Sequence, residues 1–338
     1  MKMTKRLGMM LLITLVMLPA VAQQQFTLED LNFGGTNYRK MIPKNRSLTW
    51  WGDQLVRLSS DTCWTVNTTT GKEKVLFTRE KLNVGAGLTA DSLKVNSLNM
   101  AYFPYPGKPL VLLSNMNERM LLNFKSRKVE WRQPSNAYAQ ASEWNKQSRA
   151  EAYVENDNLY VIDATGNKRQ VTSDGSRDMV YGQSVHRNEF GIDGGLFWNP
   201  QGTRLAFYRM DQSMVTDYPL ITVPELDDSA HVIATPAPEK YPMAGQTSHL
   251  VWVGVLDVAT GDTVYLKAGD PTDRYFSNIS WNPDGNIVYM MEGNRDQNVV
   301  DLVAYDAVTG NRIKTLYHEA HPKYVEPQHP ITFLPWDK

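Results

Sequence analysis

Two nearly identical segments restrict the fold of this chain more than any other feature of its sequence. Residues 197–202 read Phe-Trp-Asn-Pro-Gln-Gly and residues 280–285 read Ser-Trp-Asn-Pro-Asp-Gly, and a short apolar run follows each of them. Proline presets φ in a turn and glycine accepts a positive φ, so each copy predicts a reversal between two apolar strands. Residues 144–148, Trp-Asn-Lys-Gln-Ser, form a weaker copy of the same unit.

A second repeated unit predicts further hairpins. Residues 257–261 (Asp-Val-Ala-Thr-Gly) and 306–310 (Asp-Ala-Val-Thr-Gly) share a turn-forming pattern, and related versions occur at 67–71 and 163–166. Each copy lies between runs rich in β-forming residues, which is typical of β-hairpins. Two hairpins make a four-stranded antiparallel sheet, and a repeat of roughly 50 residues is typical of the blades of a β-propeller.

The repeats therefore predict an all-β chain, organised as a β-propeller of four-stranded antiparallel blades. Residues 23–46 are expected to form a leader segment and residues 47–338 the propeller domain. The fourth blade carries an insertion at 214–246, rich in proline and acidic residues, which we expect to be a mobile loop or an excursion. Five blades are expected, beginning near Ser47, Met100, Ser142, Leu196 and Ile279, and residues 331–336 resemble the opening of a sixth.

The amino terminus has the pattern of a secretory signal peptide. Lys2, Lys5 and Arg6 precede an apolar run at 7–18, and the small residues Ala20 and Ala22 fit a cleavage site. The apolar run is short for a bilayer, which requires about 20 residues. We therefore expect residues 1–22 to be removed and the mature protein to be periplasmic or secreted, with an uncleaved membrane anchor as the alternative.

Composition excludes some functions and supports a globular core. The formal net charge is -1 and 21% of the residues are charged, which gives no basic footprint for nucleic acid or acidic lipid. The 9 Trp and 16 Tyr supply ample apolar surface for a core. Cys63 is the only cysteine, so no intramolecular disulfide forms, and we interpret it as a small buried apolar residue rather than a nucleophile.

The stretch 180–200 concentrates polar groups in front of an apolar strand. His186, Arg187, Asn188 and Glu189 follow one another, and three glycines then precede the strand that starts near Leu196. A carboxylate placed in this way can bind a cation. Glycines allow tight backbone conformations, so the pattern indicates a site fixed to a scaffold.

This stretch, with Gly-Thr-Arg-Leu-Ala-Phe-Tyr-Arg-Met-Asp at 202–211 and Tyr-Pro-Met-Ala-Gly at 241–245, resembles the amino-terminal β-propeller of bacterial dipeptidyl peptidase IV, in the prolyl oligopeptidase family. The resemblance covers nearly all of the expected mature chain. It implies a propeller of about eight blades followed by an α/β-hydrolase domain. The sequence is therefore expected to be a truncated, partial dipeptidyl peptidase IV-like propeller.

The resemblance also implies where substrate would bind. Members of the family hold the free amino group of the peptide with a Glu-Glu pair on a short helical insertion, and by spacing to Phe197 that pair falls on Asn188 and Glu189. Asn188 departs from the pattern, and a solvated loop carboxylate is the alternative interpretation of Glu189. The family also uses an arginine of the second blade to hold a substrate carbonyl. Arg119 is the candidate by its blade, but the local match is poor, and an ordinary surface charge on a hairpin is the preferred interpretation.

No catalytic residue is expected in the chain. An α/β-hydrolase needs a serine in a G-x-S-x-G elbow, whereas the nearest string, Gly-Gln-Ser-Val-His at 182–186, lacks the second glycine. His318 and His321 are spaced as metal ligands on one helix face, but Pro322 indicates a connection between blades. Neither a metal nor another cofactor is expected.

The leading hypothesis is a substrate-recognition propeller of a secreted serine dipeptidyl peptidase that removes amino-terminal dipeptides after Pro or Ala. Its expected partners are peptides with a free amino terminus and the hydrolase domain of the parent protein, and a homodimer of that parent is left open. The alternative is a free-standing periplasmic propeller that binds proteins or peptides without catalysis.

Overall fold

The computed structural model describes residues 26–35, 37–41, 47–91, 93–224 and 233–334, so the predicted signal peptide at 1–22 lies outside the described residues. The leader contains two single-turn helices, α2 (Leu28–Leu31) and α3 (Tyr38–Met41). Thr27 caps α2 because its side chain accepts from the backbone N–H of Asp30, while the Asp30 carboxylate accepts from the N–H of Thr27. Among the described residues, no helix has both the length and the apolar character needed to cross a membrane.

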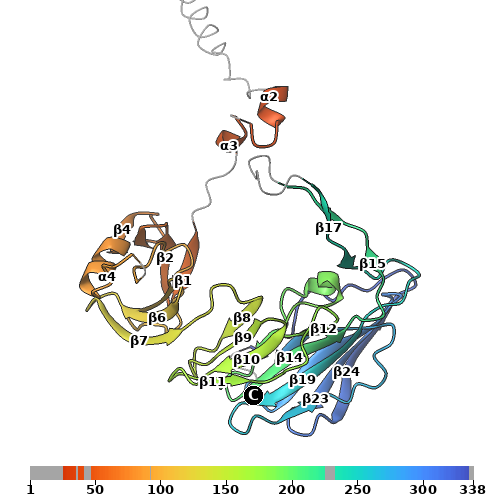
Figure 1. Ribbon diagram of the computed structural model, residues 1–338. Helices are drawn as coiled ribbons and strands as arrows, with labels where there is room; N and C mark the ends of the chain where they lie inside the picture. Colours follow the sequence, from red (N-terminus) through yellow and green to blue (C-terminus); the bar gives the residue numbers. More distant parts are fainter. Residues whose placement is uncertain (1–25, 36, 42–46, 92, 225–232, 335–338) are drawn as a thin grey trace, which may run out of the picture.

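The rest of the described chain folds into five larger antiparallel sheets that follow one another in chain order, with two further two-stranded sheets in an arm (Figure 1). This confirms the predicted all-β fold. The first sheet is followed by helix α4 (Arg79–Gly85). Its four strands are β1 (Leu48–Trp51), β2 (Gln54–Leu58), β3 (Thr62–Val66) and β4 (Glu73–Thr78).

The second sheet is one strand short of the predicted pattern. It contains β5 (Leu110–Ser114), β6 (Glu118–Asn123) and β7 (Lys128–Pro134). In place of a fourth strand, Tyr102 forms a single antiparallel bridge to Leu112.

The third and fifth sheets each have four strands in sequence order. The third contains β8 (Ala141–Trp144), β9 (Glu151–Glu155), β10 (Asn158–Ile162) and β11 (Lys168–Gln170). The fifth contains β21 (Arg274–Trp281), β22 (Ile287–Asn294), β23 (Val299–Asp306) and β24 (Arg312–Ala320). Residues 331–334, within the predicted start of a sixth blade, form no strand in the part of the chain that the structure describes.

The fourth sheet corrects the predicted start of its blade. Both β12 (Met179–Tyr181) and β13 (Leu196–Trp198) pair with the long strand β14 (Arg204–Asp211), which then pairs with β19 (Leu250–Asp257). Strand β20 (Thr263–Tyr265) completes the sheet. The inner strand therefore begins at Met179 rather than near Leu196, because the chain leaves the sheet after Tyr181 and returns at Leu196. We call residues 182–195 the interrupting segment.

The fifth blade also starts earlier than predicted. Strand β21 begins at Arg274 rather than near Ile279, since a bulge between Ser277 and Ser280 divides it into two parts. The Trp-Asn-Pro repeat marks only the second part of the strand. A bulge adds an unpaired residue to one strand, which breaks the alternation that sequence patterns rely on.

The predicted excursion at 214–246 is a narrow antiparallel arm that extends from the fourth sheet (Figure 1). Over the described residues it is a paired structure rather than a loop. Its strands are β15 (Asp217–Tyr218) with β18 (Glu239–Lys240), and β16 (Ile221–Thr222) with β17 (Thr235–Pro236).

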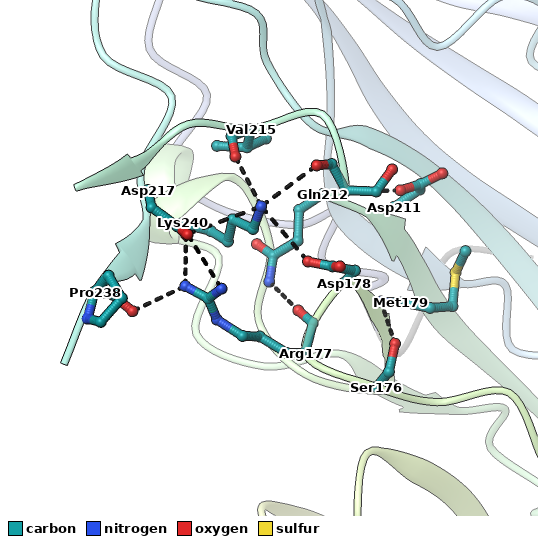
Figure 2. Close-up of polar contacts among 11 residues, drawn as sticks. Ser176, Arg177, Asp178, Met179, Asp211, Gln212, Val215, Asp217, Pro238 and Lys240 are labelled. Carbon is teal, nitrogen blue, oxygen red and sulfur yellow. Dashed lines mark hydrogen bonds and ion pairs between the residues drawn. The ribbon is translucent and has the colours of Figure 1, made fainter. Parts of the chain in front are cut away.

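Lys240 fixes the base of this arm (Figure 2). Its side chain is 12% exposed, and Nζ donates to the Val215 carbonyl at 2.9 Å and lies 3.6 Å from Asp178 Oδ1. Nearby, Arg177 Nη2 lies 2.5 Å from Asp217 Oδ1 and donates to the Pro238 carbonyl at 2.9 Å. These charge-assisted contacts join the base of the arm to Arg177 and Asp178, just before β12.

The repeated Trp-Asn residues join neighbouring blades. The indole Nε1 of Trp281 donates to the Phe197 carbonyl and that of Trp198 to the Glu143 carbonyl, both at 2.9 Å. Asn145 Nδ2 donates to the Asn199 carbonyl at 3.1 Å, and Asn199 Nδ2 to the Gly285 carbonyl at 3.3 Å. The repeat therefore forms turns and also ties blades three, four and five together.

Cys63 lies in the core of the first two blades, as predicted. It is fully buried beside Phe77 and Leu82, and burial raises the pKa of its thiol to about 12. A thiol with so high a pKa stays protonated at neutral pH and is a poor nucleophile.

Candidate functional site

The interrupting segment carries two of the three predicted site residues, and glycines let it leave and rejoin the sheet. Gly182 has φ 62°, and a Cβ there would lie 2.8 Å from Leu196 Cδ2. Gly191 has φ 73°, and a Cβ there would lie 2.4 Å from the Gln328 carbonyl oxygen. Both positions require glycine because the backbone is left-handed and the surroundings are close.

Between these glycines lies a short 3-10 turn, η1 (His186–Gly191), with an unusual backbone. His186, Arg187, Asn188 and Phe190 all have φ between 52° and 65°, whereas Glu189 has φ −61°. A left-handed conformation costs a non-glycine residue about 1–2 kcal/mol. Contacts with the surrounding structure must therefore hold the turn, as is typical of functional sites.

Two buried side chains anchor the turn to the fifth blade. Phe190 is 4% exposed, and its ring meets Tyr275 edge-on with 5.1 Å between centroids. His186 is 3% exposed, and its Nε2 accepts from the backbone N–H of Phe276 at 3.1 Å. Its Nδ1 lies 2.9 Å from Nε2 of His249, which is also buried.

Burial keeps this histidine pair neutral. It lowers the pKa of His186 well below the usual value, and the neighbouring His249 adds to the effect. Burial also lowers the pKa of His249 to about 4, assisted by the positive charges of Arg295 and Arg187. At neutral pH the pair therefore acts as a hydrogen-bonded structural unit.

Asn188 and Glu189 project from the anchored turn into solvent. Both side chains are exposed, and Asn188 Oδ1 accepts from the Ser184 hydroxyl at 2.8 Å. The Glu189 carboxylate has no hydrogen bond or ion pair with any residue that the structure describes. The turn thus presents one free carboxylate and, beside it, an amide that is already partly engaged.

Arg119 is not the ordinary surface charge preferred from the sequence. It lies on β6 with its side chain 15% exposed, and Nη2 is 3.0 Å from Oε1 of Glu151, a 2%-exposed residue on β9. The pair joins the second and third blades. Burial raises the pKa of Glu151 and the charge of Arg119 opposes that rise. Arg119 Nη1 has no partner among the described residues but is itself buried, so its binding of a substrate carbonyl stays a prediction.

A cavity of about 590 Å³ adjoins the interrupting segment, and sequence reasoning missed its two carboxylates. Its lining includes Glu143 and Ser142 from β8, and Ser184 and Asp193 from the interrupting segment. Burial raises the pKa of Glu143, the charge of Arg119 lowers it, and Asp193 raises it further. Asp193 lies within the polar stretch 180–200 that the sequence pattern singled out, whereas nothing in the sequence around Glu143 indicated a site. Neither Glu189 nor Asn188 lines the cavity.

The two candidate metal ligands lie on or after a strand, not on a helix. His318 is on β24, where Nδ1 lies 2.6 Å from Asp301 Oδ1, and His321 follows the end of that strand. Within the described ranges, no group of three or more His, Cys, Asp or Glu side chains is arranged to hold a metal ion.

Comparisons with known proteins agree on one family. Residues 111–338 match the model of the dipeptidyl peptidase IV (DPP IV) N-terminal region. A probable dipeptidyl-aminopeptidase B of Fusarium vanettenii is 29% identical over 240 residues, covering 64% of this chain and 26% of that protein. The corresponding protein of Metarhizium robertsii is 26% identical over 328 residues, covering 80% of this chain and 35% of that protein.

Two solved structures are also similar. A putative dipeptidyl aminopeptidase IV from Bacteroides ovatus gives a TM-score of 0.80 at 43% identity, covering 93% of this chain and 43% of that one. Dipeptidyl peptidase 4 of Porphyromonas gingivalis gives a TM-score of 0.67 at 18% identity, covering 90% and 44%, and shows the shared fold alone. The chain therefore spans less than half the length of each of these relatives.

Proposed function

The chain belongs to the dipeptidyl peptidase IV N-terminal region family, and from this premise we propose that it is the substrate-recognition propeller of a secreted serine dipeptidyl peptidase. In this role it binds the free amino terminus of a peptide from which a dipeptide is removed after Pro or Ala. The nucleophile, acid and histidine would come from an α/β-hydrolase domain of a longer protein, since the relatives are two to four times as long as the matched region.

The observation that carries this proposal is the Glu189 carboxylate. It stands exposed on a turn whose neighbours, His186 and Phe190, are buried. An ammonium group and a carboxylate form a charge-assisted hydrogen bond, which is roughly twice as strong as a neutral one. Because the turn is anchored on both sides, Glu189 would hold the amino terminus at a fixed point and so set how far a peptide can enter.

Asn188 supports the same role with a neutral group. Its Oδ1 accepts from Ser184, and an amide oxygen has a second lone pair that remains available for an ammonium. One formal charge is lost relative to a pair of glutamates. We therefore assign the main contact to Glu189 and a secondary contact to Asn188.

Peptide binding to the 338-residue chain tests the proposal. We expect Ala-Pro-Ala with a free amine to bind, and its N-acetylated form to bind much more weakly. Hydrogen bonds to charged groups contribute about 1.5–3 kcal/mol, so Glu189→Gln should weaken binding of the free peptide roughly ten- to a hundredfold. Asn188→Ala should have a smaller effect.

Glu80→Gln is the matched control, because it removes an exposed carboxylate from α4. It should leave both the affinity and the melting temperature unchanged. The proposal fails if free and acetylated peptides bind equally. It also fails if Glu189→Gln lowers the melting temperature strongly while the affinity stays the same, since Glu189 would then be a structural residue.

Secretion is the second part of the proposal, and it rests on residues 1–22, which lie outside the described residues. Positive charges, a short apolar run and small residues before Gln23 fit a cleaved signal peptide. Mass spectrometry of the exported protein should find an amino terminus at Gln23. Recovery of an intact Met1 outside the cytoplasm would contradict it.

A further inference from the structure

We propose that His249 is a positioning residue for peptide recognition: it fixes the ring of His186, which in turn holds the turn that presents Glu189. This inference rests on the proposed function of Glu189. His249 itself does not contact the exposed face of the turn, because its side chain is 4% exposed and faces His186.

The hydrogen bonds of His186 determine where the protons lie. Nε2 accepts from the backbone N–H of Phe276 at 3.1 Å, so it carries no proton. A neutral imidazole then has its proton on Nδ1, and this N–H donates to Nε2 of His249 at 2.9 Å. His249 must therefore be neutral as well, with its own proton on Nδ1. The neutral state of both rings is the one in which every contact pairs a donor with an acceptor.

His249 is what selects this tautomer. Without an acceptor at its Nε2, the His186 Nδ1–H would be buried without a partner. The other tautomer would instead direct an Nε2–H at the N–H of Phe276. Either outcome leaves a buried donor unsatisfied and weakens the link between η1 and β21.

The His186–Phe276 hydrogen bond helps to hold the conformation of η1, because the backbone of this turn is strained. Four residues of η1 are left-handed. The described contacts that oppose relaxation include the His186 hydrogen bonds, the ring contacts of His186 and Phe190 with Tyr275, the Ser184–Asn188 hydrogen bond, and the backbone hydrogen bonds from Asn188 to Val185 and from Ile192 to Glu189. Arg187 adds an exposed ion pair, 3.5 Å from Glu239 of the arm, and its guanidinium lies 5.0 Å from the centre of the Tyr241 ring. Loss of the buried bond would therefore let Glu189 sample other positions.

Charged groups around the pair favour the same neutral state. Arg295 lies on the blade-five side, where it pairs with Asp273 at 2.7 Å and donates to the Gln246 carbonyl. Arg187 lies on the turn itself. Both disfavour a proton on His249, and His249 disfavours one on His186. No carboxylate contacts either ring among the described residues, so nothing there stabilises an imidazolium.

The test compares His249→Leu, which removes the acceptor, with His249→Gln, which keeps a neutral acceptor of similar reach. Three quantities are measured on the 338-residue chain: the ¹⁵N shifts of the His186 ring, amide exchange at 186–190 and Phe276, and the affinity for Ala-Pro-Ala. For His249→Leu we expect a changed ring spectrum and exchange faster by about five- to a hundredfold, with affinity reduced by a similar factor. His249→Gln should retain the wild-type exchange and affinity.

Amide exchange in β19, outside the turn, reports whether the fold survives. With β19 protected, an unchanged exchange rate at 186–190 in His249→Leu would overturn the inference. Faster exchange without loss of affinity would also overturn it, provided that Glu189→Gln does weaken binding. If neither Glu189→Gln nor His249→Leu changes the affinity, both the recognition role of Glu189 and the positioning role of His249 are wrong. If His249→Leu unfolds, the test uses His249→Gln instead. A folded His249→Gln variant that binds Ala-Pro-Ala more weakly than the wild type would then contradict the inference.

Discussion

A proton added to either ring of the His186–His249 pair sets two donors against each other. On His249 Nε2 it would oppose the Nδ1–H of His186, and on His186 Nε2 it would oppose the backbone N–H of Phe276. This arrangement predicts how stability depends on pH. The pKa of His249 is lowered to about 4 in the folded state, whereas an unfolded histidine has a pKa near 6.5. The stability that its neutral form contributes is therefore complete above about pH 6.5 and is lost progressively as the pH falls towards 4.

The expected loss from His249 between pH 7.5 and pH 5 is about 2 kcal/mol of unfolding free energy. Urea unfolding at the two pH values measures it. Glu151 and Glu143 have raised pKa values and act in the opposite direction, so His249→Gln serves as the reference. This variant should lose less stability than the wild type on acidification. Equal losses in both proteins would show that His249 does not carry the pH dependence.

Residue-level sequence reasoning located Glu189 but not what surrounds it. The family resemblance, together with the spacing to Phe197, placed Asn188 and Glu189 on a short helical insertion, and the structure has the turn η1 there. Their binding of a substrate amino group stays a prediction. The partners of His186 are 63 and 90 residues away in the sequence. Arg119 gave no sign of burial either, since its partner Glu151 belongs to the next blade. Contacts between blades leave no local pattern in the sequence.

At the scale of strands and turns, the asparagines of the Trp-Asn repeat stabilise their own turns and some of them also connect neighbouring blades, and these two roles can be tested separately. Asn199 and Asn282 each accept two backbone N–H groups in their own turn. Asn199 Nδ2 also reaches the Gly285 carbonyl of the next blade, whereas Asn282 Nδ2 donates to Asn286 of its own turn. The two asparagines thus differ in one contact between blades.

We predict that Asn199→Ala destabilises the chain more than Asn282→Ala does. Both changes leave two partly buried backbone N–H groups without an acceptor, which costs about 1–3 kcal/mol. Asn199→Ala also removes the bond to Gly285, for an additional cost of about 1 kcal/mol. Chemical denaturation of both variants measures the difference. Equal losses would mean that the bond between blades contributes nothing to stability.

The sequence predicted the hairpins better than the strand starts. Its Trp-Asn-Pro and Asp-x-x-Thr-Gly turns mark reversals because proline and glycine impose their own φ values. Strand β12 has only three residues and is separated from β13 by the interrupting segment. A strand that short has no alternation to recognise, so the start of the fourth blade could not be read from the pattern. The arm was recognised as an insertion, but its pairing was not.

At the scale of the whole molecule, the proposed function separates recognition by the blades from catalysis by another part of a longer protein. The part of the chain that the structure describes contains five successive blade sheets, of which Trp and Asn side chains tie the third, fourth and fifth together. Under the proposed function, this series presents a binding site and does not perform the reaction. The comparison structures are more than twice as long as the region they share with this chain. Recognition and bond cleavage are therefore expected to depend on different parts of a longer protein.

The last prediction follows from this separation: the 338-residue chain alone should not hydrolyse Gly-Pro amide substrates. No G-x-S-x-G elbow occurs in its sequence. Ser184, the closest approximation, donates its hydroxyl to Asn188 rather than to an imidazole, and His186 is occupied by Phe276 and His249. Release of a chromogenic amine by the purified chain is the measurement, with Ser184→Ala as the control. Turnover that disappears in Ser184→Ala would identify Ser184 as a nucleophile and contradict the assignment of this chain to recognition.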